Sequence, residues 1–353
     1  MTPAAVVLEP ILKARPWGGA ALARWGKALP ADVLIGESWE LSDLPGDESR
    51  VARGPLRGHT IRELMSEWGR HLLGDCAPVA GRFPLLVKLL DAADNLSVQV
   101  HPRPRDVNDQ GSGVNSGLPY PAVKHECWFV LEALPGAVLY AGLRPGITSA
   151  ELAETLGTPR IVELLARREV RAGDCFYLPS GTLHALGAGI LVAEVQTPSD
   201  VTYRAYDWER RDSAGRAREL HLSESLDNVR WDVAESHILA AASASDPESA
   251  RFAPITGATP LVRCPAFALD RWSGPIGAEL DLRGEMAVLI GLAGRLASSS
   301  AAGGESLGGG ETMLVPATCA RQALRVVPGL SDEAASGAAE QRGAVVLIAR
   351  ATA

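Results

Sequence analysis

Two histidines, a glutamate and a glutamine, spread over three short segments, are the side chains in this chain best suited to hold a metal ion. Gln99 and His101 lie in SVQVHP, Glu126 lies in KHECW, and His184 lies in PSGTLHALG. Two imidazoles, a carboxylate and an amide oxygen suit zinc best, and a carboxylate ligand is typical of catalytic zinc sites with an open position. Iron or manganese would also accept this set.

The elements that must position these side chains are β-strands. Val98 and Val100 alternate with Gln99 and His101, so the period of two places the glutamine and the histidine on one face of a strand. His184 follows an apolar run and a Pro-Ser-Gly turn, and is predicted to begin another strand. Glu126 enters a third, ECWFVLEAL, which is rich in aromatic and branched residues.

Neighbouring His125 is predicted to point away from this set, because successive side chains of a strand alternate between its faces. Each of the four candidate ligands also has an ordinary interpretation when it is taken singly. A histidine at a strand end is more often hydrogen-bonded or exposed than bound to metal, so the interpretation depends on the segments around the four residues.

Those segments resemble the type I mannose-6-phosphate isomerases, a cupin family. The similarity follows the family order through PWGG at 16–19, IGESWELS at 35–42, FPLLVKLLDA at 83–92, LSVQVHP at 96–102, KHECWFVLEA at 124–133, and the stretch 173–208. The resemblance implies one zinc ion per chain, with other divalent metals possible, held by Gln99, His101, Glu126 and His184. It also implies that the chain interconverts mannose 6-phosphate and fructose 6-phosphate through an enediol.

The same resemblance places Glu194, Lys124 and Arg204 near the substrate. Arg204 would stabilise negative charge during proton transfer, because a guanidinium stays protonated and offers a rigid fork of donors. Lys124 lies two residues before Glu126 and therefore on its face, and Glu194 shares a strand face with Gln196. Either Glu194 or Lys124 is the general base, and the sequence leaves both open.

Three further basic residues are candidates for binding the substrate. Lys88 interrupts an apolar strand, where an unpaired ammonium would be costly, so it contacts either the substrate or a nearby carboxylate. Arg103 and Arg105 stand where the family usually carries an acidic turn after QVHP. These arginines would either assist phosphate binding or indicate a paralogue whose substrate differs from that of the family.

The fold is predicted to be mainly β, with two cupin-like β-barrel (jelly-roll) domains and small helical insertions. A weak repeat supports this, since Gly173 and Gly310 each precede a proline, Pro179 and Pro316, by six positions. We predict a metal-binding catalytic domain over 1–240 and a cupin-like domain without a metal site over 241–353. Helices are predicted in the segments 60–74, closed by a glycine, and 147–170, split near Gly157 and Pro159.

Composition and charge argue against a nucleic-acid-binding protein and against a membrane-spanning one. The chain has 353 residues, a net charge of −8 and no cluster of lysine and arginine, so a nucleic-acid partner is not expected. No apolar run approaches the ~20 residues of a membrane span. Five cysteines without a CxxC pair are typical of reduced thiols in a cytoplasmic protein. We expect a cytoplasmic monomer or homodimer whose partner is a small-molecule sugar phosphate.

Two other functions are compatible with the ligand set. A cupin dioxygenase or related metal-dependent oxidoreductase would use two histidines and a carboxylate to hold iron, but it leaves the order of Lys124, Glu194 and Arg204 unexplained. A non-catalytic cupin that binds a sugar phosphate would use the metal only to build the pocket. Fold alone does not choose among these functions, because cupins host many.

Overall fold

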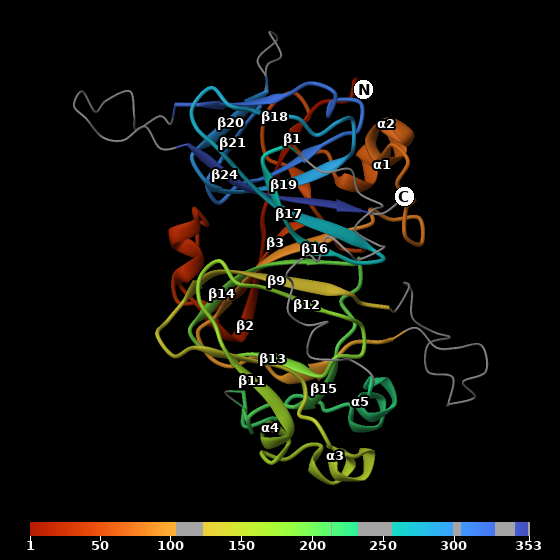
Figure 1. Cartoon of the computed structure of the whole chain (residues 1–353), viewed down its shortest axis with the longest axis vertical. Coiled ribbons are helices and arrows are strands. Elements are labelled where there is room, and N and C mark those ends of the chain that lie inside the picture. Colours follow the sequence, from red (N-terminus) through yellow and green to blue (C-terminus); the bar gives the residue numbers. More distant parts are fainter. Residues whose placement is uncertain (104–122, 213, 232–255, 299–304, 329–342, 352–353) are drawn as a thin grey trace.

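Two antiparallel β-barrels, one above the other in Figure 1, make up most of the molecule, and short helices lie at their sides. The computed structural model describes residues 1–103, 123–212, 214–231, 256–298, 305–328 and 343–351. The predicted fold class, mainly β with two cupin-like barrels and small helical insertions, is confirmed. The strands that carry Gln99, Glu126 and His184 all belong to the N-terminal barrel.

Two sheets face each other in the N-terminal barrel. The six-stranded sheet has the order β12-β9-β14-β7-β3-β2, from Cys175–Leu178, Glu126–Ala133, Ile190–Gln196, Leu86–Ala92, Ile35–Leu41 and Ile11–Gly19. The five-stranded sheet has the order β11-β10-β13-β8-β15, from Leu165–Glu169, Val138–Leu143, His184–Leu186, Val98–Val100 and Tyr203–Tyr206. A small ribbon is formed by β4 and β5, Asp43–Leu44 and Asp47–Glu48.

The C-terminal barrel also has two sheets. Its seven-stranded sheet has the order β16-β17-β24-β19-β22-β1-β6, from Ala258–Arg263, Phe267–Gly274, Ala344–Ala351, Ala287–Ala293, Thr312–Val315, Val6–Glu9 and Arg50–Val51. Its four-stranded sheet has the order β18-β23-β20-β21, from Glu279–Leu280, Leu324–Val327, Arg295–Ser298 and Ser306–Gly308.

Two strands from the start of the chain, β1 and β6, complete the sheet of the C-terminal barrel, because β1 pairs with β22 on one side and β6 on the other. The predicted boundary at residue 240 lies outside the described residues, so the division into 1–240 and 241–353 stays a prediction. The Gly-to-Pro repeat corresponds to equivalent strands: β12 ends directly before Pro179, and β22 ends directly before Pro316.

Short helices are inserted between strands. α1 begins after Thr60, whose side chain accepts a hydrogen bond from the backbone N–H of Glu63 while the Glu63 carboxylate accepts one from Thr60, a capping box. The prediction of one helix through residue 74 is wrong, because Gly69 adopts a positive φ of 47° and separates α1 from α2. The predicted split near Gly157 is confirmed. The helical elements are η1 Ala21–Trp25, α1 Ile61–Trp68, α2 Arg70–Leu73, α3 Ser149–Thr155, α4 Ile161–Leu164 and α5 Leu222–Asn228.

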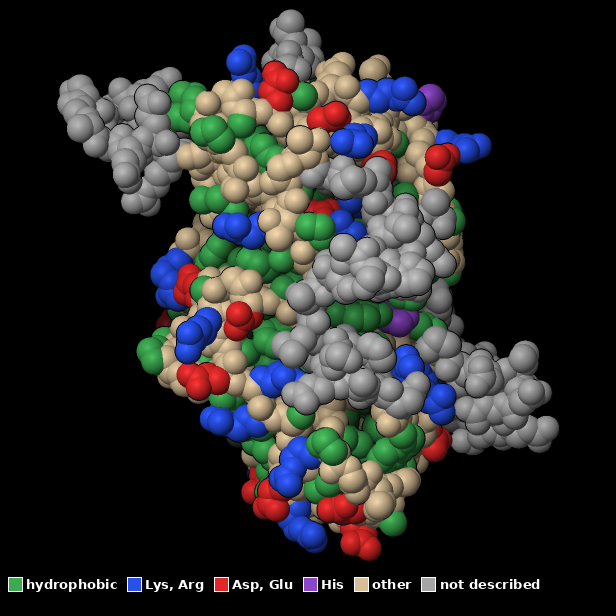
Figure 2. Space-filling model, viewed as in Figure 1, with side chains coloured by type: hydrophobic (Ala, Val, Ile, Leu, Met, Phe, Trp, Pro, Cys, Tyr) green, Lys and Arg blue, Asp and Glu red, His purple; other side chains and the backbone are tan. Residues whose placement is uncertain are grey.

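The molecular surface carries both signs of charge. Figure 2 shows basic and acidic side chains interspersed over the face in view, rather than gathered into a patch of one sign. Within the described residues, no helix has the length and apolar character needed to cross a membrane.

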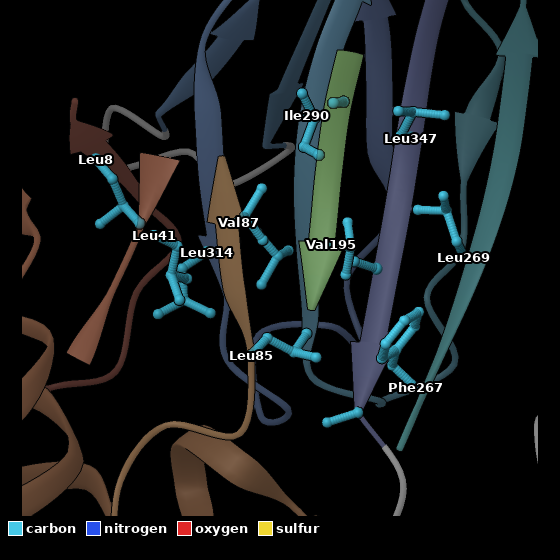
Figure 3. Packing of buried hydrophobic residues seen from close by; sticks show 14 of the residues in the cluster. Leu8, Leu41, Leu85, Val87, Val195, Phe267, Leu269, Ile290, Leu314 and Leu347 are labelled. Carbon is cyan, nitrogen blue, oxygen red and sulfur yellow. The ribbon is translucent and has the colours of Figure 1, made fainter. Parts of the chain in front are cut away.

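The two barrels share a hydrophobic core. Val87 of β7 and Val195 of β14 belong to the same buried cluster as Ile290 of β19 and Leu347 of β24, and Figure 3 shows these side chains between the two sheets. Because strand residues alternate between faces, the neighbours of Val87 and Val195 along each strand point the other way, into the N-terminal barrel. The outer face of the six-stranded sheet therefore holds the barrels together, and its inner face is free to carry polar side chains.

One buried ion pair also joins the barrels. The Lys27 ammonium lies 2.7 Å from a carboxylate oxygen of Glu40 on β3 and donates to the carbonyl of Gly310, which precedes β22. Glu40 also accepts hydrogen bonds from Ser38 at 2.6 Å and from Thr312 at 3.1 Å. Both charged side chains are almost fully buried, so each depends on the other for compensation.

Replacing Lys27 with alanine is expected to lower the free energy of unfolding by about 3–5 kcal/mol, because Glu40 would be left buried without a counter-charge. Urea denaturation would measure the loss. The double variant Lys27→Met with Glu40→Gln is the control, since it removes both charges and is expected to regain most of the stability. A loss under about 1 kcal/mol in Lys27→Ala, typical of an exposed pair, would contradict this role.

Candidate metal centre

Side chains from both sheets of the N-terminal barrel converge on one point in its interior. His184 begins β13 and pairs directly with Gln99 of β8, and His101 follows the end of β8. Glu126 begins β9 in the opposite sheet. One potential ligand atom each from His101, Glu126 and His184 lies within 4.8 Å of the others, and these three form the one such group among the described residues.

Backbone carbonyls orient both histidines. Nδ1 of His101 lies 2.9 Å from the carbonyl of Val201, and Nδ1 of His184 lies 2.8 Å from that of Thr182. A carbonyl only accepts, so each Nδ1 carries the proton and each Nε2 presents a lone pair. These Nε2 atoms lie 3.2 Å and 3.0 Å from the carboxylate oxygens of Glu126. Two lone pairs and a carboxylate that meet at such distances suit a shared cation.

The charge states of these groups also suit a metal. Burial would raise the pKa of Glu126, but the charge of the neighbouring Lys124 ammonium holds that pKa well below its usual range. Burial, followed by the charge of Lys124, lowers the pKa of His101 to about 4. Glu126 is completely buried, and neither of its oxygens accepts a hydrogen bond of normal geometry from the described residues, although the Lys124 ammonium lies 2.7 Å from one. An ionised carboxylate beside neutral imidazoles is what zinc requires.

Gln99 lies at the edge of this group. Its amide nitrogen is 3.3 Å from Nε2 of His184, and its amide oxygen is 3.5 Å from the hydroxyl of Ser97. A half-turn of the amide exchanges the two atoms and would point the oxygen toward the histidine, as a metal ligand requires. His125 lies outside the group, as its alternation predicts: its Nδ1 is 2.8 Å from the hydroxyl of Tyr177.

Comparisons with known proteins agree with this site. The family model for the type I phosphomannose isomerase catalytic domain matches residues 6–126. Mannose-6-phosphate isomerase ManA of Bacillus subtilis is 36% identical over 274 residues, which cover 77% of this chain and 80% of the relative. The mannose-6-phosphate isomerase of Streptococcus mutans is 39% identical over 212 residues, which cover 60% of this chain and 63% of the relative. The chain belongs to the type I phosphomannose isomerase family.

Solved structures extend the likeness to the whole fold. The crystal structure of mannose 6-phosphate isomerase from Bacillus subtilis has a TM-score of 0.77 and 28% identity, and covers 98% of this chain and 99% of that chain. The Salmonella typhimurium mannose 6-phosphate isomerase, bound to fructose 6-phosphate and zinc, has a TM-score of 0.72 at 17% identity, and covers 99% of this chain and 100% of that chain. At that identity the second likeness concerns the fold alone.

In this phosphomannose isomerase family member, the inner face of the six-stranded sheet carries two further candidates, Glu194 and Lys88. Glu194 of β14 pairs across the sheet with Lys88 of β7 and Trp128 of β9. The Lys88 ammonium lies 3.1 Å from Asp200 and 3.7 Å from Glu194. Lys88 is therefore paired with carboxylates, which was one of the two interpretations from the sequence. One of these carboxylates is Glu194, the candidate base.

Arg204 of β15 pairs across the five-stranded sheet with Gln99, so it is next to the candidate ligands. Its guanidinium donates to the carbonyl of Glu219 at 2.8 Å. Asp207, the partner that an ordinary surface ion pair would give Arg204, instead binds Arg210 and Arg218.

One of the two candidate arginines after QVHP, Arg103, is joined to α5 through its backbone. The backbone N–H of Arg103 donates to the side chain of Asn228 at 3.3 Å, which ties the segment after His101 to α5. Arg105 lies outside the described residues.

Sequence reasoning missed two residues that bind Lys88 and Glu194. Asp200 holds the Lys88 ammonium, and Trp128 donates a hydrogen bond to Glu194 at 2.8 Å. Alternation from Glu126 could have placed Trp128 on the inner face, since the two residues are separated by one position. No pattern identifies Asp200, because it follows the end of β14 and its partner lies 112 positions away along the chain.

Proposed function

We propose that this chain is a metal-dependent aldose–ketose isomerase that interconverts mannose 6-phosphate and fructose 6-phosphate through an enediol. The observation that carries the proposal is the convergence of His101, Glu126 and His184 inside the barrel of a type I phosphomannose isomerase family member. The completely buried carboxylate, without a hydrogen bond of normal geometry from the described residues, favours a cation over a purely structural cluster.

The proposed cofactor is one zinc ion, held by Gln99, His101, Glu126 and His184. When bound, zinc supplies Lewis acidity that stabilises negative charge on the sugar oxygens during proton transfer. The protein contributes fixed ligand orientation, because the carbonyls that accept from the two histidines prevent their rings from turning.

We assign the general base to Glu194 and a supporting role to Lys124. Burial, followed by the negative charge of Glu126, raises the pKa of Glu194, which brings it closer to the range where a carboxylate transfers protons efficiently near neutral pH. Lys124 lies against Glu126 and 3.1 Å from Nε2 of His101, so it is suited to hold charge at the ligands. Arg204, next to Gln99, is proposed to stabilise negative charge on the enediol oxygens.

The phosphate of the substrate is proposed to bind near Lys88, Arg103 and Arg105. Lys88 is 4% exposed and its ammonium stacks over the ring of Trp39 at 4.6 Å, so it is held in a fixed position. Arg103, two residues after His101, would add positive charge on that side of the barrel. We further propose a cytoplasmic monomer or homodimer, with catalysis in the segment 1–240 and no metal site in 241–353.

An isomerase assay in both directions tests the function. Purified protein should interconvert mannose 6-phosphate and fructose 6-phosphate, lose turnover after chelation, and regain it when zinc is restored. Unchanged turnover with all metal removed would overturn the metal dependence. Zinc bound without turnover would favour a sugar-phosphate-binding cupin, and oxygen consumption with iron would favour an oxidoreductase.

A further inference from the structure

One buried tryptophan touches both the proposed base and a proposed metal ligand. Trp128 of β9 is completely buried, and its indole N–H donates to Oε2 of Glu194 at 2.8 Å. Its ring is also nearly perpendicular to the imidazole of His184, with 5.3 Å between the ring centres and 78° between the ring planes. The two contacts come from opposite sheets of the barrel, so Trp128 connects the sheet of Glu194 to the sheet of His184.

The hydrogen bond leaves the two oxygens of Glu194 in different surroundings. Oε2 accepts from the indole, whose nitrogen is a donor only. Oε1 faces the Lys88 ammonium at 3.7 Å, beyond hydrogen-bond distance. The carboxylate therefore cannot turn freely, and Oε1 is the oxygen left to exchange a proton.

We propose that Trp128 is a positioning residue that fixes the Glu194 carboxylate through its N–H and steadies the His184 imidazole through its ring. This inference rests on the proposed isomerase function and on the role of Glu194 in it. A carboxylate that must meet a carbon-bound proton gains from a fixed orientation, because small misplacements reduce the rate strongly. The ring contact would act separately, on how firmly His184 holds the metal.

Trp128 also has a plain structural interpretation. A buried indole needs a hydrogen-bond acceptor, and Glu194 would serve even in a protein without activity. That interpretation predicts a loss of stability on substitution, without a selective effect on kcat. Steady-state measurements of kcat and KM, together with metal analysis of the same samples, therefore distinguish the two interpretations.

The first variant is Trp128→Phe, which removes the N–H and keeps an aromatic ring. We expect kcat to fall by about 10–100-fold, the usual effect of losing an outer-shell orienting contact, with KM and zinc content close to wild type. Trp68→Phe is the matched control, since Trp68 of α1 is also buried and donates its indole N–H to the carbonyl of Met1 rather than to a candidate site residue. Its kcat should stay at the wild-type value.

Two further variants test the N–H contact and the ring contact of Trp128 separately. Benzothienylalanine at position 128 preserves the shape of the indole without its N–H, so it should reproduce the kcat loss even if Trp128→Phe packs badly. Trp128→Leu removes the ring as well, and zinc competition measurements on the resting protein should show weaker zinc binding than in Trp128→Phe. Unchanged kcat with benzothienylalanine, or unchanged zinc affinity in Trp128→Leu, would refute the corresponding half of the proposal.

A double-mutant cycle with Glu194→Gln separates this inference from the proposed function. If Trp128 acts through Glu194, adding Trp128→Phe to Glu194→Gln should cause no further loss of kcat. Equal losses in both backgrounds would show that Trp128 acts elsewhere. If the wild-type protein does not isomerise the sugar phosphates at all, the function itself fails. If Glu194→Gln alone is inactive and Trp128→Phe is fully active, the positioning role alone fails.

Discussion

The variant His184→Ala is expected to lose bound zinc and isomerase activity together. His184 supplies one of two imidazole nitrogens next to Glu126, and its other nitrogen is held by the carbonyl of Thr182. Alanine removes a proposed ligand outright, so the loss of zinc affinity should exceed the ~10–100-fold that follows when only an outer-shell partner is removed. Metal analysis after dialysis and an isomerase assay on the same samples would measure both effects.

His125 provides the matched control for this experiment. It is a partly buried histidine, and burial followed by the charge of Arg230 lowers its pKa to about 4, but its Nδ1 lies 2.8 Å from the hydroxyl of Tyr177 rather than next to the candidate ligands. His125→Asn should therefore retain one zinc ion per chain. Full activity in a zinc-free His184→Ala protein would contradict the assignment, whereas zinc loss in both variants would indicate general damage to the barrel.

The ligand types and strand alternation were accessible from the sequence because both are local. A period of two along a strand decides which side chains share a face, so Gln99 and His101 could be grouped without knowledge of the fold. The capping residue Thr60 and the break near Gly157 are likewise encoded within a few positions. The resemblance to a family then joined segments that alternation alone could not bring together.

Other features depend on pairing between distant segments. The contact between Trp128 and Glu194 depends on the register of β9 against β14, and Asp200 reaches Lys88 across 112 positions. The entry of β1 into the C-terminal barrel depends on its pairing with β22, from the far end of the chain. No local pattern determines such contacts, because hydrophobic alternation specifies which face a residue occupies and not which strand it meets.

The variant Glu194→Gln tests whether Glu194 or Lys124 is the base, and a large loss of kcat is expected. Glu194→Gln keeps the size of the side chain and its capacity to accept from Trp128, but it cannot take a proton. We expect kcat to fall by about 100–10,000-fold, the range typical of losing a general base, while zinc content stays at the wild-type value. Steady-state kinetics and metal analysis would measure the two quantities.

Lys124→Met is the comparison that makes this result decisive. Lys124 lies 2.7 Å from a Glu126 oxygen and 3.1 Å from Nε2 of His101, so its removal should change zinc affinity as well as activity. Exchange of the substrate C2 proton with solvent reports on the base directly, and it should be lost in Glu194→Gln. If exchange persists in Glu194→Gln and disappears in zinc-loaded Lys124→Met, Lys124 is the base, and Glu194 serves only to hold Lys88 and Trp128 in place.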